Sequence, residues 1–466
     1  MQRWHITTAL AASAVVAAVL VPELAGTRPG PPIAPVPDAG SAPAPTPASS
    51  GLLTLRASLD QAAVLSGTAQ DRYLVVEVSA PELPGDERRP VHLAVVMDTS
   101  GSMAARGKIT NARMAARELA GLMGPRDTLS LVTFASTATV QRPSQPVTDA
   151  AHVGRLVDGI QPEGGTNLHA GLAAGLDQLG HADLDGVKRV VLLSDGKVTM
   201  GVSDPATLVR EAGSRVLSGV SVSALGLGVD YDEDLLSAMS DAGGGSYRFV
   251  DRPGQLASLF AEELQQMGAI AGREALVDIQ LPTGVTLEEV YGYQATSSPR
   301  GFSVFLGDVH GGETRKIVAR IQVAPAAEGP LDVADVGLRY ADARTGEDGG
   351  AHADVAAVVT TSTQEARDSR DDAALAKATA ARSAQLLDAS ARDWERGDLE
   401  ANQTKLDEAE QLLRSVGSLT GNAGLLQEAD AYRTRREAFE GAPMASADGR
   451  YQVKKAKEVS RARSRR

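Results

Sequence analysis

The pattern of apolar and polar positions divides the chain into regions of different fold. Continuous apolar runs at 91–97, 128–134 and 189–194 are typical of strands that are buried on both faces of a sheet. Apolar residues at helical spacing lie between them, as in residues 109–123. Strands that alternate with helices predict a parallel sheet with helices on both faces, and here the alternation covers residues 91–268.

Short β-favouring runs flank this region on both sides. They occur in residues 52–90, for example at 72–78, and again in residues 269–362, where glycine and proline turns separate them. Such a pattern predicts an antiparallel β-sandwich. The predicted fold class is therefore α/β, with a Rossmann-like doubly wound parallel sheet that is inserted in, or flanked by, the sandwich.

The last hundred residues have a helical pattern that ends in a basic segment. Residues 363–441 carry apolar positions at helical spacing, and Gly397 and Gly421 break the pattern, which predicts a helical hairpin with a third helix. Residues 442–466 follow, with eight Lys or Arg from position 450 onward. A run of this kind predicts a solvated, disordered tail, and contact with an anionic lipid, polymer or nucleic acid is the alternative.

The N-terminal residues 1–25 have the layout of an export signal. Arg3 and His5 precede the apolar run 8–21, which is short for a helix that spans a membrane. We expect a signal peptide and an extracytoplasmic protein that is secreted, periplasmic or membrane-anchored and facing outward. An uncleaved anchor, which would associate the chain with a membrane, is the alternative. Residues 26–51 are rich in Pro and Ala, which predicts an extended linker.

Composition narrows the class of partner. A chain of 466 residues exceeds what one hydrophobic core usually organises, so two or three domains are expected. The formal net charge of −13 argues against a nucleic-acid partner, because an acidic chain repels phosphates. The absence of cysteine excludes disulfides and thiolate metal sites.

Side chains with oxygen atoms occur in three loops of the predicted α/β region. One group comes directly after the strand 91–97, a second lies in a glycine-rich loop, and a third follows the strand 189–194. Because the carboxyl ends of parallel strands open onto one crevice, these side chains can meet there. Three hydroxyls and two carboxylates suit Mg²⁺, and Mn²⁺ and Ca²⁺ accept the same ligands. The candidate metal ligands are Asp98, Ser100, Ser102, Thr166 and Asp195.

The order of these motifs resembles the von Willebrand factor A domain and its metal-ion-dependent adhesion site. The pattern is DxSxS, then a threonine in a glycine-rich loop, then an aspartate after an apolar strand, and the resemblance extends over about 91–267. It implies that the three hydroxyls coordinate the ion directly or nearly so, while Asp98 and Asp195 hold it directly or through water. The flanking β regions more loosely resemble inter-alpha-trypsin inhibitor heavy chains, and this likeness implies no enzymatic activity.

Neutral hydroxyl ligands would leave the cation much of its positive charge. Such an ion attracts an Asp or Glu carboxylate from a protein partner. We therefore expect an exported bacterial-type binding protein that captures its partner through Mg²⁺, and not an enzyme. The alternative is a cell-envelope scaffold or assembly factor that uses the helical region and the basic tail, with the metal site as a regulatory latch.

Three other interpretations of the motif stay open at this point. Each loop taken alone fits an ordinary helix cap or turn. A serine hydrolase using Ser100 or Ser102 would lack the GxSxG elbow and a histidine paired by motif. An aspartyl-phosphate nucleophile at Asp98 would lack its usual partner, since Ser100 stands where a second aspartate is expected.

Overall fold

The computed structural model describes residues 48–83, 89–180, 186–325, 327–443 and 446–465, which belong to one compact unit of the chain. The expected signal peptide, residues 1–25, and most of the expected linker lie outside the described residues. No helix in the described part of the chain is both long and apolar enough to cross a membrane.

The predicted linker ends earlier than expected. Ala48–Ser50 forms the short strand β1, which pairs antiparallel with β17 (Asp348–Thr360). Strand pairing uses backbone N–H and C=O groups, so a segment without large apolar side chains can still join a sheet. The linker prediction for residues 26–51 is therefore wrong for its last residues.

A six-stranded sheet forms the α/β domain. Parallel pairing joins all of its neighbouring strands except the pair at one edge, β6 and β7, which is antiparallel. In spatial order the strands are β10 (Gly244–Val250), β9 (Val220–Leu227), β8 (Val187–Ser194), β5 (Val91–Asp98), β6 (Thr128–Phe134) and β7 (Ala138–Pro146). Every residue of β5 is buried, as its continuous apolar run predicts.

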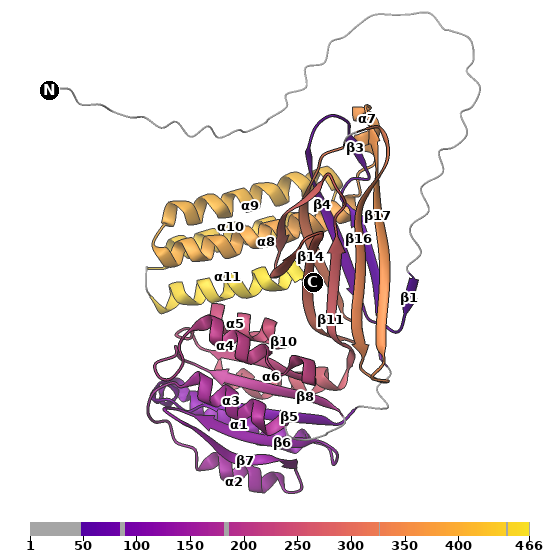
Figure 1. The fold of residues 1–466 in the computed structure, drawn as a ribbon. Coiled ribbons are helices and arrows are strands. Elements are labelled where there is room, and N and C mark those ends of the chain that lie inside the picture. The colour runs from indigo at the N-terminus through magenta and orange to yellow at the C-terminus, as the bar shows by residue number, and fades with distance from the viewer. Residues whose placement is uncertain (1–47, 84–88, 181–185, 326, 444–445, 466) are drawn as a thin grey trace, which may run out of the picture. The chain divides into compact units, whose positions relative to one another are not determined.

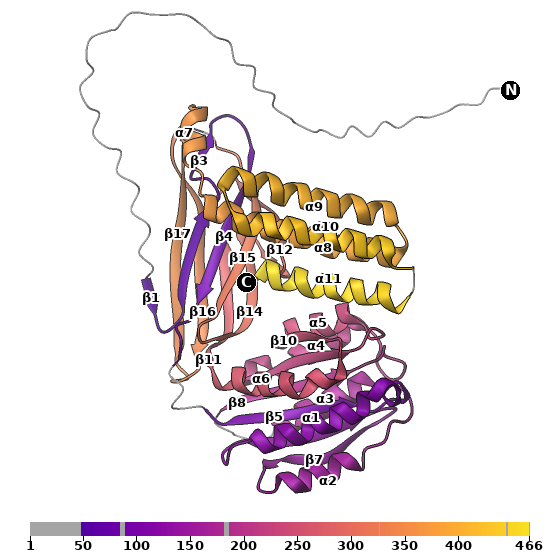
Figure 2. The same ribbon diagram turned by 180° about the vertical axis from the view of Figure 1, so that it is seen from behind.

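Helices cover both faces of this sheet (Figure 1, Figure 2). One apolar cluster joins the sheet to α1, α2 and α6, and a second joins its other face to α3, α4 and α5. The helices are α1 (Lys108–Leu122), α2 (Ala150–Asp158), α3 (Leu168–Gly180), α4 (Pro205–Gly213), α5 (Glu233–Ala242) and α6 (Leu256–Gly268). Short 3-10 turns stand at Gly101–Gly107, Val216–Ser218 and Pro253–Gln255.

Two sheets, antiparallel except where β3 pairs with β17, enclose a third apolar core, and the α/β domain is inserted between their strands. One sheet contains β1, β17, β16 (Gly329–Asp342), β11 (Ile270–Gln280), β14 (Gly301–His310), β13 (Ala295–Ser298) and β3 (Ala63–Leu65). The other contains β12 (Val285–Tyr291), β15 (Thr314–Val323), β4 (Gln70–Ser79) and β2 (Thr54–Leu59). The chain leaves the sandwich after β4 and returns at β11, so the predicted fold class is confirmed.

The C-terminal helices pack on each other and on the sandwich. The helix α8 contacts the outer face of the four-stranded sheet, where Ala374 and Ala378 lie against Val75 and Val318. Both glycines expected to break the helical pattern, Gly397 and Gly421, cap helices in the left-handed conformation. The helices are α7 (Thr363–Asp368), α8 (Asp372–Arg396), α9 (Leu399–Thr420), α10 (Ala423–Gly441) and α11 (Ala447–Arg465).

The basic segment 442–466 is not the disordered tail that its composition predicts, because most of it is α11. Val453 and Ala456 are buried in the core of the C-terminal helices. Its cations pair with carboxylates that lie mostly in distant parts of the chain, so their charge is matched by other elements of the protein. The pairs are Arg450–Asp230, Lys454–Glu233, Lys455–Glu458, Lys457 with Glu233, Asp234 and Glu395, Arg461–Asp241, Arg463–Glu428 and Arg465–Asp241.

Candidate metal site

The candidate ligands come together at the carboxyl ends of two neighbouring strands. Strands β5 and β8 pair in parallel with Met97 opposite Leu193, so Asp98 and the Ser194–Asp195 pair leave the sheet side by side. The loop that carries Thr166 joins them, because Gly101 N–H donates to the carbonyl of Gly164 at 3.1 Å. The parallel register therefore brings together residues that are far apart in the sequence.

Asp98 is fully buried and held by its neighbours. Its Oδ1 accepts from the backbone N–H of Ser100 at 2.8 Å, and its Oδ2 accepts from the hydroxyl of Ser194 at 2.7 Å. Burial raises the pKa of Asp98 and outweighs the hydrogen bonds from Ser100 and Ser194, which lower it. A buried carboxylate of this kind is stabilised by a nearby cation.

The two serines of the motif lie in hydrogen-bonding contact. Ser100 Oγ and Ser102 Oγ are 3.0 Å apart, and Ser102 Oγ donates to Oδ1 of Asp195 at 2.7 Å. Ser100 is 2% exposed, whereas Ser102 is exposed. The cluster therefore opens to solvent on the side of Ser102.

Thr166 completes the cluster from the glycine-rich loop. A Cβ on Gly196 would lie 3.4 Å from Thr166 Oγ1 and 3.5 Å from Ser102 Oγ, so both hydroxyls flank this glycine. Thr199 accepts a hydrogen bond from the Thr166 N–H at 2.8 Å and returns one from its own N–H to the Thr166 carbonyl at 3.1 Å. The structure thus brings all five predicted residues into one site.

Two residues of the site were not predicted from the sequence. Ser194 donates to Asp98, as described, and Lys108 donates from Nζ to Oδ2 of Asp195 at 2.5 Å. Lys108 is 6% exposed and Asp195 is fully buried, so this is an ion pair in the interior. Lys108 is the first residue of a helix, a position where a lysine side chain is ordinarily solvated. Its burial can be recognised only from the folded structure.

The arrangement of oxygens fits a magnesium ion. Oxygens on adjacent corners of an octahedron with bonds of about 2.1 Å are about 3 Å apart. Ser100 Oγ and Ser102 Oγ at 3.0 Å, and Ser102 Oγ and Asp195 Oδ1 at 2.7 Å, are at ordinary hydrogen-bond distances, which are also compatible with neighbouring ligands of one ion. With a metal bound, these hydroxyls and carboxylates would hold the ion, which would supply a positive charge at the solvent-facing side of the cluster.

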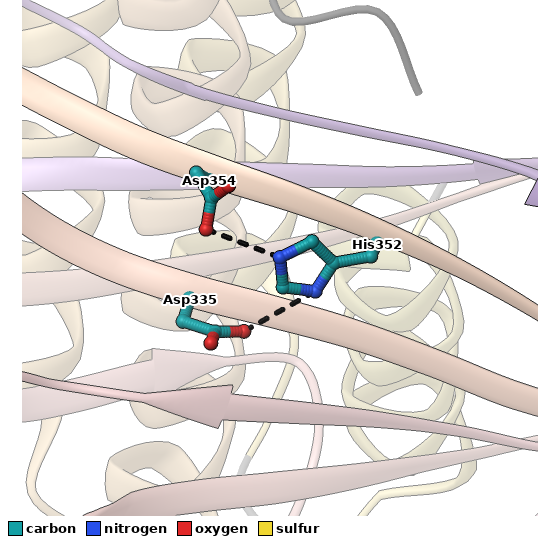
Figure 3. Close-up of side chains that lie close together, drawn as sticks. All are labelled: Asp335, His352 and Asp354. Carbon is teal, nitrogen blue, oxygen red and sulfur yellow. Dashed lines mark hydrogen bonds and ion pairs between the residues drawn. The ribbon is translucent and has the colours of Figure 1, made fainter. Parts of the chain in front are cut away.

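A second group of potential ligands lies on the sandwich. Asp335 on β16 stands opposite Asp354 on β17, and His352 lies between them (Figure 3). His352 Nδ1 is 3.4 Å from Asp335, and its Nε2 is 3.1 Å from Asp354. Because each ring nitrogen faces a different carboxylate, the group fits a histidine that bridges two acids better than three ligands converging on one ion.

The α/β domain matches a known family. The family model of the von Willebrand factor type A domain matches residues 93–197, a stretch that includes all five candidate ligands. The chain therefore contains a von Willebrand factor type A domain.

Several proteins have related sequences. An uncharacterised Escherichia coli protein, YfbK, is 26% identical over 228 residues, 48% of this chain, and the matched stretch spans only 40% of that relative. An uncharacterised Synechocystis protein, sll0103, is 24% identical over 298 residues, 62% of this chain and 70% of the relative. Human inter-alpha-trypsin inhibitor heavy chain H4 is 30% identical over 210 residues, 43% of this chain and 22% of its own length.

Solved structures share the fold well beyond the α/β domain. A von Willebrand factor type A protein from Catenulispora acidiphila superposes with a TM-score of 0.66 at 18% identity, over 88% of this chain and 97% of the other. The ArnB paralog VWA2 from Sulfolobus acidocaldarius gives 0.58 at 19% identity, over 89% and 99% of the two chains. The insertion of the α/β domain in a sandwich with attached helices is therefore a shared architecture.

Proposed function

We propose that this chain is a non-enzymatic binding protein that captures a protein partner through a divalent cation. Asp98, Asp195 and the three hydroxyls would hold the ion, with Mg²⁺ as the first choice and Mn²⁺ or Ca²⁺ as alternatives. An Asp or Glu carboxylate of the partner would then bind the ion from the solvent side. The proposal includes an extracytoplasmic location, which the pattern of residues 1–25 supports, with membrane association if that segment stays attached.

The observation that carries the proposal is the charge of the cluster. Three of its five oxygen donors are neutral hydroxyls, and one of its two carboxylates is already paired with Lys108. A divalent ion at this place would keep a net positive charge, and a positive ion at a solvent-facing site favours an anionic ligand. A hydrolytic role has less support. The family match is to a von Willebrand factor type A domain, and the sequence contains no GxSxG elbow.

The surface beside the cluster is also suited to a protein partner. Met200 is 45% exposed and lies at the edge of the site, since its N–H donates to the carbonyl of Thr166 at 3.2 Å. An exposed methionine offers a flexible apolar contact to a bound chain. We expect the partner to place an apolar residue near its metal-binding carboxylate.

The scaffold alternative is weakened by the position of α11. That hypothesis needs a basic tail that is available to a partner, whereas the cations of α11 in the described residues are paired with carboxylates of this chain. The helical region could still contact other proteins. The metal site is the better supported contact surface.

A capture experiment tests the proposal. The full chain is immobilised and incubated with exported proteins in Mg²⁺ or in EDTA, for the wild type and for Asp98→Ala. We expect a captured protein that requires both Mg²⁺ and Asp98. Asp348→Ala, at an exposed position on β17, is the matched control and should capture as the wild type does. Capture that survives both EDTA and Asp98→Ala would contradict the proposal.

A further inference from the structure

Lys108 is a buried cation in direct contact with a candidate metal ligand. Its Nζ lies 2.5 Å from Oδ2 of Asp195, while Oδ1 of the same carboxylate accepts from Ser102 Oγ at 2.7 Å. Asp195 therefore presents one oxygen to the hydroxyl cluster and the other to an ammonium group. Any divalent ion held by this cluster would share Asp195 with Lys108.

The position of Lys108 is unfavourable on local grounds. It is the first residue of α1, where the helix dipole disfavours a positive charge, and burial disfavours a charge that is not paired. Gly228, which directly follows β9, lies beside it: a Cβ there would be in van der Waals contact with the Cε of Lys108, at 3.5 Å. The Asp195 carboxylate is the interaction in the structure that offsets these costs.

The charges of the site follow from this contact. Asp98 and Asp195 bring two negative charges, and Lys108 brings one positive charge, so the cluster has a net charge of −1. A divalent ion would make the sum +1. Repulsion between the ion and the ammonium group is weakly screened, because Lys108 and both carboxylates are buried.

We propose that Lys108 is a resident counter-cation: it balances Asp195 when the site holds no divalent ion, and its charge weakens the binding of that ion. The inference rests on the metal site of the proposed function. A partner carboxylate would return the net charge of the site to zero. The ion and the partner would then each strengthen the binding of the other, by the same factor.

The test uses Mn²⁺ as the probe, titrated into the full chain and followed by electron paramagnetic resonance of the free ion. In Lys108→Met we expect the dissociation constant for Mn²⁺ to fall by about tenfold or more, since a repelling charge is removed. The melting temperature in EDTA should fall at the same time, because Asp195 loses its counter-charge. A purely structural lysine would not raise the affinity for Mn²⁺ while it lowers the melting temperature.

Two further variants make the experiment decisive. Lys108→Gln is also neutral but keeps a donor for Asp195. It should bind Mn²⁺ more tightly than the wild type does, and it should lose less stability than Lys108→Met. Lys454→Met is the matched control, since Lys454 is a buried lysine that pairs with Glu233 and, among the described residues, contacts none of the five candidate ligands. It should lower the melting temperature and leave the affinity for Mn²⁺ unchanged.

The outcomes separate the two proposals. If the wild type binds Mn²⁺ and both Lys108 variants bind it equally or more weakly, the counter-cation role is overturned and the metal site stands. If neither the wild type nor the Lys108 variants show saturable binding of Mn²⁺, the proposed function itself fails. Tighter binding in both Lys108 variants, with unchanged binding in Lys454→Met, supports the inference.

Discussion

Ser194 supports the buried carboxylate of Asp98 with a single hydrogen bond. Its hydroxyl donates to Oδ2 at 2.7 Å, and both side chains are excluded from solvent. Ser194→Ala leaves a charged oxygen without this donor, which should lower the free energy of unfolding by about 1–3 kcal/mol. Thermal melts in EDTA, followed by circular dichroism, measure the change without any contribution from a bound metal.

The matched control for Ser194 is another buried serine of the same sheet. Ser130 lies on β6, is fully buried, and its Oγ has no hydrogen-bond partner among the described residues. Removing an unsatisfied buried hydroxyl is neutral or stabilising, so Ser130→Ala should not lower the melting temperature. Equal losses in the two variants would contradict a specific role for the Ser194 hydroxyl.

Lys316 gives a prediction about pH. It is 5% exposed on β15, and burial lowers its pKa to about 8, with only the carbonyl of Arg463 accepting from its Nζ in the described residues, at 3.2 Å. Folding therefore disfavours the charged form of Lys316, which the unfolded chain keeps up to about pH 10. Lys316→Met should stabilise the protein by about 1–3 kcal/mol at pH 7, after allowance for the lost hydrogen bond.

The sign of the pH effect follows from the lowered pKa of Lys316. Between pH 8 and the ordinary lysine value of about 10.4, the unfolded chain binds more protons than the folded protein, so wild-type stability rises with pH. The advantage of Lys316→Met should shrink over this range in melts at pH 7, 8.5 and 10. An advantage that stays constant with pH would contradict the assignment.

The sequence predicts the ligands of the candidate site better than their support. Asp98 and Ser100 stand directly after a buried strand, where a short motif is visible without the fold. Lys108 and Ser194 contact the same carboxylates, but neither stands in a motif. Ser194 reads as the last residue of a strand, and the direction of its hydroxyl is fixed by the pairing of β5 with β8. Such contacts depend on three-dimensional packing, which periodicity does not contain.

At the scale of elements, α11 contacts the α/β domain through ion pairs and through Tyr451, which packs against Phe249. Arg461 and Arg465 both pair with Asp241 on α5, and their attraction outweighs the effect of burial, so the pKa of Asp241 lies below its usual range. Asp241→Asn leaves both guanidinium groups without this carboxylate. We expect α11 to detach more often, which would expose its many Lys and Arg residues to trypsin.

Limited trypsin digestion measures this detachment. The C-terminal helix of Asp241→Asn should be removed several times faster than in the wild type, and the wild type should approach that rate in high salt, because salt screens ion pairs. The control is Asp230→Asn, which breaks the more exposed pair with Arg450. Its digestion rate should stay close to that of the wild type. Equal digestion of Asp241→Asn and the wild type would show that the two Asp241 ion pairs do not hold α11.

The error about the tail has a physical cause. A segment with eight Lys or Arg in its last seventeen residues has too little apolar surface to fold by itself. The carboxylates that neutralise it include Glu233 and Asp241, more than two hundred residues earlier in the chain. Local composition correctly described the charge of this segment, but only the fold reveals its partners.

At the scale of the whole molecule, a buried ion pair connects the α/β domain to the sandwich. Arg189 on β8 is 1% exposed and donates to Asp308 on β14 at 2.6 Å, with Glu263 of α6 as a further partner at 3.3 Å. The inserted domain and the sandwich have separate apolar cores. This contact between the α/β domain and the sandwich therefore couples the stabilities of the two domains.

Removing the sandwich partner should reveal that coupling. Asp308→Asn leaves Arg189 buried with Glu263 as its remaining carboxylate, so the loss of stability should stay below the cost of a buried charge left without a partner, about 3–5 kcal/mol. Differential scanning calorimetry should show a first transition at a lower temperature than in the wild type, with the α/β domain and the sandwich unfolding in separate transitions. Asp335→Asn, at an exposed position on β16, should melt as the wild type does. A single transition at the wild-type temperature in Asp308→Asn would mean that connections other than the Asp308 contact make the two domains unfold together.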